Sequence, residues 1–269
     1  MLRRQAFNIV ALSWIFLGLS MLISAGWSLY YSESDLWPIL NSSAITVGVG
    51  IFVFFLTYTK KSKDLTPRDG FAIVTLGWIA MAGFCALPMY FATDLSYTNA
   101  YFEAMSGLTT TGASILGGAS TVTIESLPHG ILFWRSFTHF IGGMGIIVFS
   151  LAILPMLGMG GVQLFRAEVA GPIADKLTPR VKQTAKLLWY IYVGFVAIES
   201  IILKMVGMTW FDAICHSFGT MATGGFSTRD TSVGAFSGTV QMVLLVFMFL
   251  AATNFSLHYL SFNKRKFEY

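Results

Sequence analysis

Two short stretches of the chain combine hydroxyl side chains with glycine in the same way. They are "TTTGAS" (109–114) and "MATGGFS" (221–227). Glycine permits backbone dihedrals that aim successive carbonyls in one direction, and its missing side chain leaves room beside them. Rings of such carbonyls replace the hydration shell of an ion. We therefore expect a dehydrated monovalent cation to bind the carbonyls of six residues: Thr110, Thr111, Gly112, Ala222, Thr223 and Gly224.

An internal repeat relates the two stretches. The motif "LTPR" occurs at 65–68 and again at 177–180, an offset of 112 residues. Proline suits the first turn of a helix, with the preceding threonine as a cap. The same offset aligns Gly107 with Gly219, Thr111 with Thr223 and Gly112 with Gly224. The repeat predicts two copies of one unit, in which a basic loop, a span, a short helix, a glycine-containing turn and a second span follow each other.

Two points about these turns stay open at the level of sequence. The hydroxyls of Thr110, Thr111 and Thr223 either stabilise the turn or add ligands. The glycines have a plainer interpretation as helix ends. We prefer the ion-binding interpretation because the arrangement occurs twice in one register.

The elements that position the turns are those of a membrane protein. Of the 269 residues 55% are hydrophobic and 11% are charged, against roughly a quarter charged in soluble domains. Segments 98–109 and 210–222 are too short to cross a bilayer, so we expect them to be re-entrant helices that dip in from the outer side. The expected fold is an all-α polytopic membrane protein with six spans, at 7–30, 36–59, 70–93, 136–165, 187–207 and 231–263.

The basic residues predict the orientation of these spans. Fourteen of the 17 lysines and arginines fall before span one, between spans two and three, between spans four and five, or after span six. Positive charge accumulates in cytoplasmic loops, so both termini are expected in the cytoplasm. The opposite face carries acids: Glu33, Asp35, Asp94, Glu103, Glu125, Asp212 and Asp230.

Three longer stretches carry a resemblance to a known family. They are "YFEAMSGLTTTGASIL", "FWRSFTHFIGGMGIIVFSLAILP" and "FDAICHSFGTMATGGFSTRD". Together they resemble the first two pore repeats of the Trk/Ktr potassium-uptake superfamily, in particular its TrkH/TrkG-type membrane subunits. The resemblance covers nearly the whole chain. It predicts an N-terminal two-span unit (1–62) followed by two span–pore-helix–span repeats (63–168 and 169–269).

The resemblance also implies a function and partners. It implies K⁺ as the transported ion, no organic cofactor, a multi-pass protein of the bacterial inner membrane, and a cytoplasmic nucleotide-binding regulatory subunit of the TrkA type. The filter glycines of the family correspond to Gly112 and Gly224. The family has four pore units in one chain and this sequence shows two. We therefore expect either a truncated product or two copies that pair, and a non-conducting fragment that assembles with other subunits is the alternative function.

Several charged residues have two interpretations each. Glu199 and Lys204, inside span five, belong to an ion path or, as we prefer, pair with another unit or extend toward the interface. Arg135 either lies at the headgroups or contacts a pore-loop carboxylate. Glu103 and Asp212 either cap the short helices or attract cations.

The remaining glycines, histidines and cysteines show no pattern that predicts catalysis or metal binding. The glycines of "GGMG" (142–145) and "GMGG" (158–161) indicate close helix packing rather than a hinge. The four histidines lack metal-ligand spacing, and Cys85 and Cys215 suit buried apolar positions. An intramembrane enzyme would need a nucleophile–base pair or a metal cluster. The best residues for one, Glu199, His139 and Thr223, are not held together by any pattern, so we expect no enzymatic activity.

Overall fold

The computed structural model of the chain describes residues 4–58, 67–117, 122–153 and 181–253, together with 255, 257 and 258. Every regular element in these ranges is helical, which confirms the predicted all-α class. Most of the basic residues that predict the orientation lie outside these ranges, as do the second "LTPR" motif and the glycines at 158–161. The helices are α1 (Arg4–Tyr31), α2 (Leu36–Thr57), α3 (Pro67–Cys85), α4 (Leu87–Ala92), α5 (Tyr97–Leu108), η1 (Ile124–Ser126), α6 (His129–Ile153), α8 (Val181–Met205), α9 (Trp210–Met221), η3 (Ser232–Ala235) and α10 (Gly238–Ala252).

Within the described ranges, four segments are long and apolar enough to cross a membrane. They are Phe7–Tyr31, Leu36–Thr57, Ile73–Ala92 and Lys186–Met205, and they agree with four of the six predicted spans. The third joins α3 to α4. Its helix is interrupted at Ala86, two residues before Pro88, and proline lacks the amide hydrogen that a continuous helix needs.

The other two predicted spans begin elsewhere than expected. Helix α6 begins at His129 and not at 136. The prediction placed its start after Arg135 because a charge inside a span is costly, but the structure buries Arg135 within the helix. Helix α10 begins at Gly238 and not at 231, because the Ser237 hydroxyl caps it and η3 precedes it. The predicted far ends of both spans lie mostly outside the described residues.

The loop between α1 and α2 caps the N-terminus of α6. A carboxylate oxygen of Asp35 accepts a hydrogen bond from the Ile131 amide at 3.0 Å, and Ser28 donates to the other oxygen. Glu33 accepts from the His129 amide and pairs with its ring at 2.8 Å. Negative charge is favourable at this end of a helix. The N-terminal helical hairpin therefore holds the first turn of α6.

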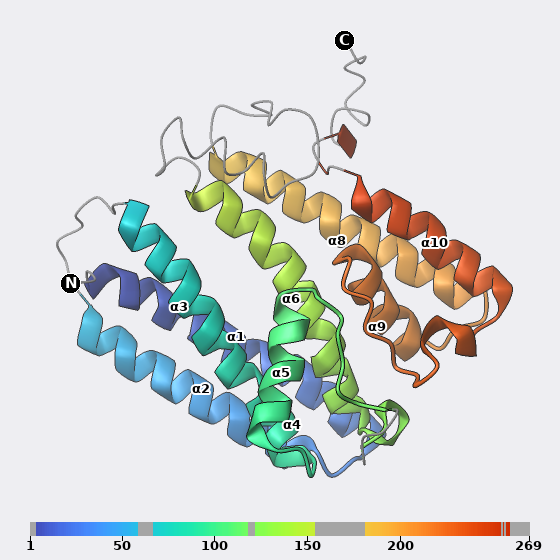
Figure 1. Cartoon of the computed structure of the whole chain (residues 1–269), viewed down its shortest axis with the longest axis horizontal. Helices are drawn as coiled ribbons and strands as arrows, with labels where there is room; N and C mark the ends of the chain where they lie inside the picture. Colours follow the sequence, from blue (N-terminus) through green and yellow to red (C-terminus); the bar gives the residue numbers. More distant parts are fainter. Residues whose placement is uncertain are drawn as a thin grey trace, which may run out of the picture.

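The short helices α5 and α9 both pack against α6 (Figure 1). Each has 12 residues, and their bounds lie within one residue of the prediction. The hydroxyl of Ser96 caps α5 by accepting from the Asn99 amide, and that of Thr209 caps α9 by accepting from the Asp212 amide. Side-chain caps of this kind define the start of a helix. Helix α6 is therefore the shared support of both short helices.

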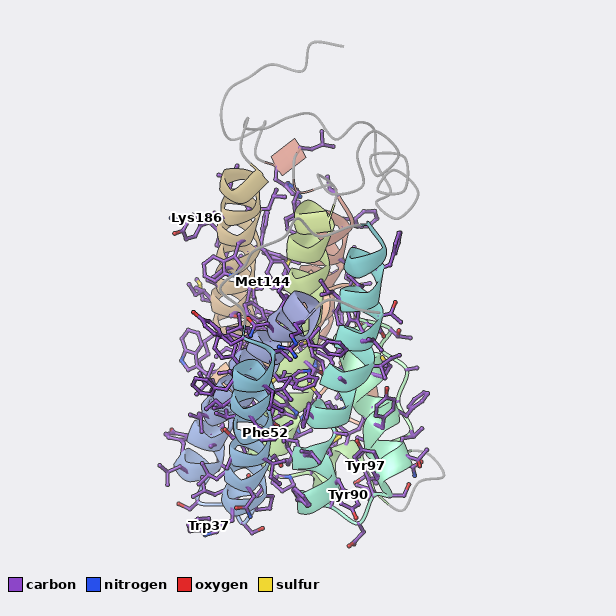
Figure 2. All side chains as sticks on the ribbon, turned by 90° about the vertical axis from the view of Figure 1, so that its left-hand side faces the viewer. Trp37, Phe52, Tyr90, Tyr97, Met144 and Lys186 are labelled. Carbon is purple, nitrogen blue, oxygen red and sulfur yellow. The ribbon has the colours of Figure 1, made fainter. Side chains whose placement is uncertain are left out.

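The outer surface of the helices is apolar. Phe52 on α2 is 65% exposed and Phe249 on α10 is 71% exposed. Figure 2 shows Trp37, Tyr90 and Tyr97 toward one end of the molecule and Lys186 toward the other. Contiguous exposed apolar surface marks a membrane or protein interface.

Candidate functional site

The two turns follow their helices with the same backbone geometry. After α5, the amides of Thr110 and Thr111 bond to the carbonyls of Gly107 and Ser106. After α9, the amides of Thr223 and Gly224 bond to the carbonyls of Thr220 and Gly219. The helix bounds and capping residues repeat at the same spacing. The two turns are therefore copies of one structure, as the repeat predicts.

The register of this repeat differs by one residue from the predicted register. In the structure Thr110 corresponds to Thr223, and Gly112 corresponds to Gly225 and not to Gly224. The second copy has one more residue between its "LTPR" motif and its short helix than the first. The predicted pairs Thr111–Thr223, Gly112–Gly224 and Gly107–Gly219 are therefore wrong, because identical residue types were aligned across that extra residue.

Backbone dihedrals identify the residues that the two turns share. Thr110 and Thr223 have φ of 54° and 57°, and Gly112 and Gly225 have φ of 75° and 85°. A β-branched residue rarely adopts a left-handed conformation, so its presence at the same place in both turns indicates that the surrounding structure imposes it. Sequence reasoning missed Gly225, although the doubled glycine of "MATGGFS" was a signal for it. Ala222 corresponds to Thr109, the residue that ends the helix.

The two turns meet backbone to backbone. A Cβ atom built on Gly112 would overlap the carbonyl oxygen of Gly224. Two glycines of α6 pack against the ends of the short helices. Gly142 lies against the Leu108 carbonyl at the end of α5, and Gly143 lies against Ala222 at the end of α9. These contacts support the packing interpretation of "GGMG". The glycines let three backbones approach more closely than side chains would permit.

Buried side chains hold the first turn from behind. The carboxylate of Glu103, fully buried in α5, accepts from the Ser114 hydroxyl and the Ile115 amide, both at 2.6 Å. The Ser106 hydroxyl donates to the Ala113 carbonyl at 2.6 Å. Glu103 therefore neither caps its helix nor meets solvent. It fixes the segment that leaves the turn.

In the second turn, His216 holds the segment that leaves the turn by hydrogen bonds, as Glu103 does in the first. Its Nδ1 lies 2.7 Å from the Asp212 carbonyl and its Nε2 lies 2.9 Å from the Ser227 hydroxyl. A carbonyl only accepts, so Nδ1 carries the proton and Nε2 of the neutral ring accepts from Ser227. Ser227 in turn accepts from the Arg229 amide at 3.1 Å. The chain after this turn is therefore tied to α9.

Arg135 on α6 joins the two units. Its Nε bonds Glu103 at 3.1 Å, and another guanidinium nitrogen donates to the Ser227 carbonyl at 3.0 Å. Its Cζ lies 3.6 Å from the centre of the Phe226 ring. Of the two interpretations of Arg135, contact with a pore-loop carboxylate is the one that the structure shows.

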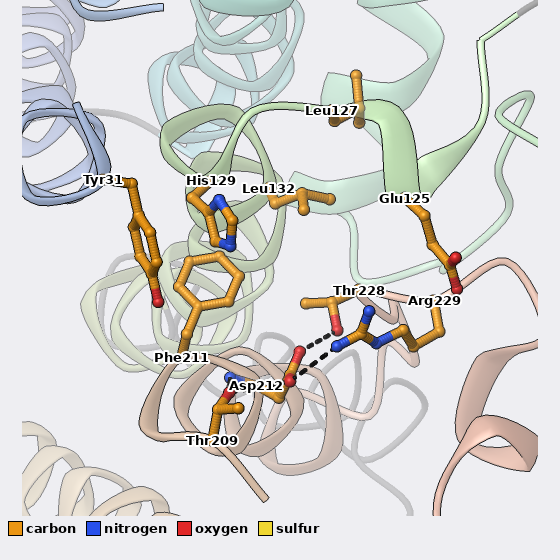
Figure 3. Close-up of a pocket in the computed structure, with 10 residues that line it drawn as sticks. All are labelled: Tyr31, Glu125, Leu127, His129, Leu132, Thr209, Phe211, Asp212, Thr228 and Arg229. Carbon is orange, nitrogen blue, oxygen red and sulfur yellow. Dashed lines mark hydrogen bonds and ion pairs between the residues drawn. The ribbon is translucent and has the colours of Figure 1, made fainter. Parts of the chain in front are cut away.

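A cavity of about 320 Å³ opens beside the start of α9 (Figure 3). The ring of His129 stacks on Tyr31 at 3.8 Å on one side of it. On the other side Asp212 accepts from Thr228 at 2.6 Å and from Arg229 at 3.1 Å. Burial raises the pKa of Asp212, but the hydrogen bonds from Thr228 and Thr209 and the charge of Arg229 outweigh it, so the pKa lies below its ordinary value.

The remaining charged candidates lie on α8. Lys204 is exposed, whereas Glu199 is fully buried in α8. Among the described residues, neither carboxylate oxygen of Glu199 has a hydrogen-bond partner that meets ordinary geometry. Thr220 on α9 is the neighbour that interacts with it. The structure thus does not join Glu199 to His139 or Thr223 as a catalytic group would require.

Comparison with known proteins gives a consistent result. The family model described as "Cation transport protein", TrkH, matches residues 39–269. The chain is 42% identical to the Trk system potassium uptake protein TrkH of Vibrio parahaemolyticus, over 96% of this chain and 53% of that protein. It is 41% identical to TrkH of Escherichia coli K12, over 95% of this chain and 53% of that protein. These relatives are named as potassium uptake proteins and not as enzymes, in agreement with the prediction of no enzymatic activity.

The structure agrees with the same family. The crystal structure of the potassium transporter TrkH from Vibrio parahaemolyticus superposes with a TM-score of 0.82 and 38% sequence identity. That match covers 97% of this chain and 52% of the other. The chain therefore spans about half the length of the relatives it matches. Sequence, family model and fold agree that the chain belongs to the TrkH family of cation transport proteins.

Proposed function

We propose that the chain contributes to potassium translocation across a membrane, through the backbone carbonyls of its two turns. The observation that carries this proposal is the meeting of two turns with the same left-handed residues, Thr110 and Gly112 in one and Thr223 and Gly225 in the other. Alternation of left-handed residues with ordinary ones aims successive carbonyls to one side. Carbonyls arranged in this way replace the hydration shell of K⁺.

The proposed ion ligands follow the structural register of the repeat. They are the carbonyls of Thr110, Thr111 and Gly112 and those of Thr223, Gly224 and Gly225. Ala222 leaves the set because it ends α9, as Thr109 ends α5. Two turns supply only part of a coordination shell. The rest comes from a second copy of this chain or from further pore repeats.

The proposed architecture is that of six spans with two re-entrant helices. Helices α6 and α10 would add two spans to the four identified by length and composition, which gives six. The proposed domains are residues 1–62, 63–168 and 169–269. Trp37, Tyr90 and Tyr97 suit one membrane interface. We place that end outside the cell and both termini in the cytoplasm of a bacterial inner membrane. The basic cytoplasmic loops would then dock a nucleotide-binding regulatory subunit of the TrkA type.

A second candidate function follows from the length of the chain relative to its relatives. With half the length of a TrkH protein, the chain could be a non-conducting piece that assembles with other subunits. Growth of a cell that lacks potassium uptake distinguishes the two functions. Expression of the chain alone should restore growth at low K⁺ if copies pair into a pore. Normal membrane insertion without restored growth would support the non-conducting piece.

Substitution of Gly112 tests the ion path directly. Gly112→Ser should lower the ratio of K⁺ to Na⁺ uptake in any assembly that transports, because a side chain there displaces the Gly224 carbonyl. Gly117→Ser is the matched control, since Gly117 also has a left-handed φ of 77° but lies outside the turn, where a Cβ atom would fall 2.9 Å from a carboxylate oxygen of Asp230. An unchanged uptake ratio in Gly112→Ser would remove Gly112 from the ion path.

A further inference from the structure

His139 occupies an unusual position behind the second turn. Its side chain is fully buried on α6, one helical turn after Arg135. Among the described residues, neither ring nitrogen has a hydrogen-bond partner. A neutral imidazole carries one N–H donor and one acceptor, and leaving such groups unpaired in a buried site costs free energy. Packing must therefore hold the ring, because hydrogen bonds do not.

Two contacts fix the position of the His139 ring. It stacks on Phe226 with 4.1 Å between the ring centres and 21° between the planes. Its far edge lies against the backbone of Gly224, since a Cβ atom built on Gly224 would fall 2.5–2.6 Å from Cε1, Nδ1 and Nε2. Real Cβ atoms do not approach other atoms so closely, so the ring occupies the space that a side chain at 224 would need.

The contact continues from the second turn into the first. The carbonyl oxygen of Gly224, on the residue that His139 supports, is the atom that a Cβ on Gly112 would strike. The His139 ring, the Gly224 backbone and Gly112 therefore form one continuous line of contact through both turns. Close-packed groups transmit displacement in this way.

We propose that His139 is a positioning residue for ion selectivity: its ring sets the place of the Gly224 carbonyl and, through it, the spacing of the two turns. This proposal rests on the proposed function, because selectivity has meaning only if the turns bind the ion. The position of the turns, in contrast, is a property of the folded chain alone and can be measured without transport.

Hydrogen exchange of the purified full chain in lipid nanodiscs reports how firmly the turns are held in that position. His139→Ala should accelerate amide exchange about tenfold in residues 108–116 and 220–228, because both turns lose their support. His139→Gln should show most of the protection that His139→Ala loses, because the planar glutamine amide can occupy the space that the imidazole edge fills next to Gly224. Exchange in α1 and α2 should not change.

Ile131→Ala is the matched control. Ile131 is fully buried on the same helix, about two turns before His139, at the end that Asp35 caps. It should leave exchange in both turns unchanged. Wild-type exchange of residues 220–228 in His139→Ala would overturn the proposal, as would acceleration there with no change in 108–116. If His139→Ala does not fold, His139→Asn takes its place, because its shorter amide cannot reach the backbone of Gly224. Wild-type exchange in both turns of His139→Asn would then overturn the proposal.

Transport gives the second readout. In an assembly that transports, His139→Ala should lower the ratio of K⁺ to Na⁺ uptake by about tenfold, and His139→Gln should recover it. A ratio equal to that of the wild type would overturn the role in selectivity. If the wild-type chain itself transports no K⁺, the proposed function fails, while the exchange measurement still decides whether His139 positions the turns.

Discussion

At the scale of residues, one buried cation organises both turns. Arg135 is 1% exposed and bonds a carboxylate of the first unit and a carbonyl of the second. A buried charge is tolerated when it is paired and hydrogen-bonded. Removing one partner of a buried pair leaves the other uncompensated, which costs more than the pair itself contributed. The Arg135–Glu103 pair therefore makes the two turns dependent on each other.

Glu103→Gln tests this dependence. It should lower the free energy of unfolding by about 3–5 kcal/mol, because it leaves the Arg135 guanidinium buried without a counter-ion. The double variant Glu103→Gln with Arg135→Met should recover part of the loss. Thermal unfolding of the purified protein in detergent measures both.

The pair of Arg229 and Asp212 is the control for this prediction. Because Arg229 is 39% exposed, Arg229→Gln should cost less than about 1 kcal/mol. Equal losses in Glu103→Gln and Arg229→Gln would contradict the structural importance of the buried pair.

The types of the turn residues could be predicted from sequence, but their conformations could not. Hydroxyls and glycines at 109–114 and 221–227 stand out because they interrupt apolar segments. Which residues are left-handed depends on hydrogen bonds from the turn back to its helix, such as Thr111 to Ser106. Contact of Arg135 with a pore-loop carboxylate is one of two sequence interpretations, but no local pattern decides between them or identifies Glu103, which lies 32 positions away on a different helix.

At the scale of elements, the sequence predicts the bounds of a helix well when residues next to the helix determine them. The bounds of α5 and α9 follow from their short apolar lengths and from the caps Ser96 and Thr209. The start of α6 does not, because Glu33 and Asp35 define it from another part of the chain. A helix start that depends on tertiary contacts is also sensitive to the charge of the residue that caps it.

The pH dependence of stability tests the cap on α6. Burial raises the pKa of Asp35 above 3.8, although the Ser28 hydrogen bond opposes this. The folded chain therefore binds more protons than the unfolded chain just above that pH, so this contribution to stability falls as pH rises. The difference in unfolding temperature between wild type and Asp35→Asn should decline from about pH 4 upward and then level off.

Asp212→Asn provides the comparison of opposite sign. The pKa of Asp212 lies below 3.8 in the folded chain, so its contribution to stability is present above that pH and is lost as pH falls through the folded pKa. The difference between wild type and Asp212→Asn should therefore shrink toward acidic pH. Parallel slopes for the two variants would contradict the opposite environments of these carboxyl groups.

At the scale of the whole molecule, the apolar surface and the residues at the two ends support the proposed membrane orientation. Exposed apolar side chains such as Phe52 and Phe249 surround the helices. Trp37, Tyr90 and Tyr97 lie toward one end of the molecule and Lys186 toward the other (Figure 2). The acids Glu33 and Asp35 lie at the end where α6 begins. In the proposed orientation that end lies outside, because basic residues are retained in the cytoplasm. The proposed orientation would present the N-termini of α5 and α9 to the outside and their C-terminal ends, where the turns begin, to the membrane interior.

Labelling of single cysteines tests the orientation. Ser126 and Lys186 are both exposed, and they precede α6 and lie near the start of α8 respectively. A thiol reagent that cannot cross membranes should label Ser126→Cys in intact cells and should label Lys186→Cys only after the cells are opened. The native Cys85 and Cys215 are buried, so the unsubstituted chain should give a low background. The reverse labelling pattern would show that the proposed orientation is wrong. The two turns would then face the cytoplasm, and they could not form a filter that faces the outer solution.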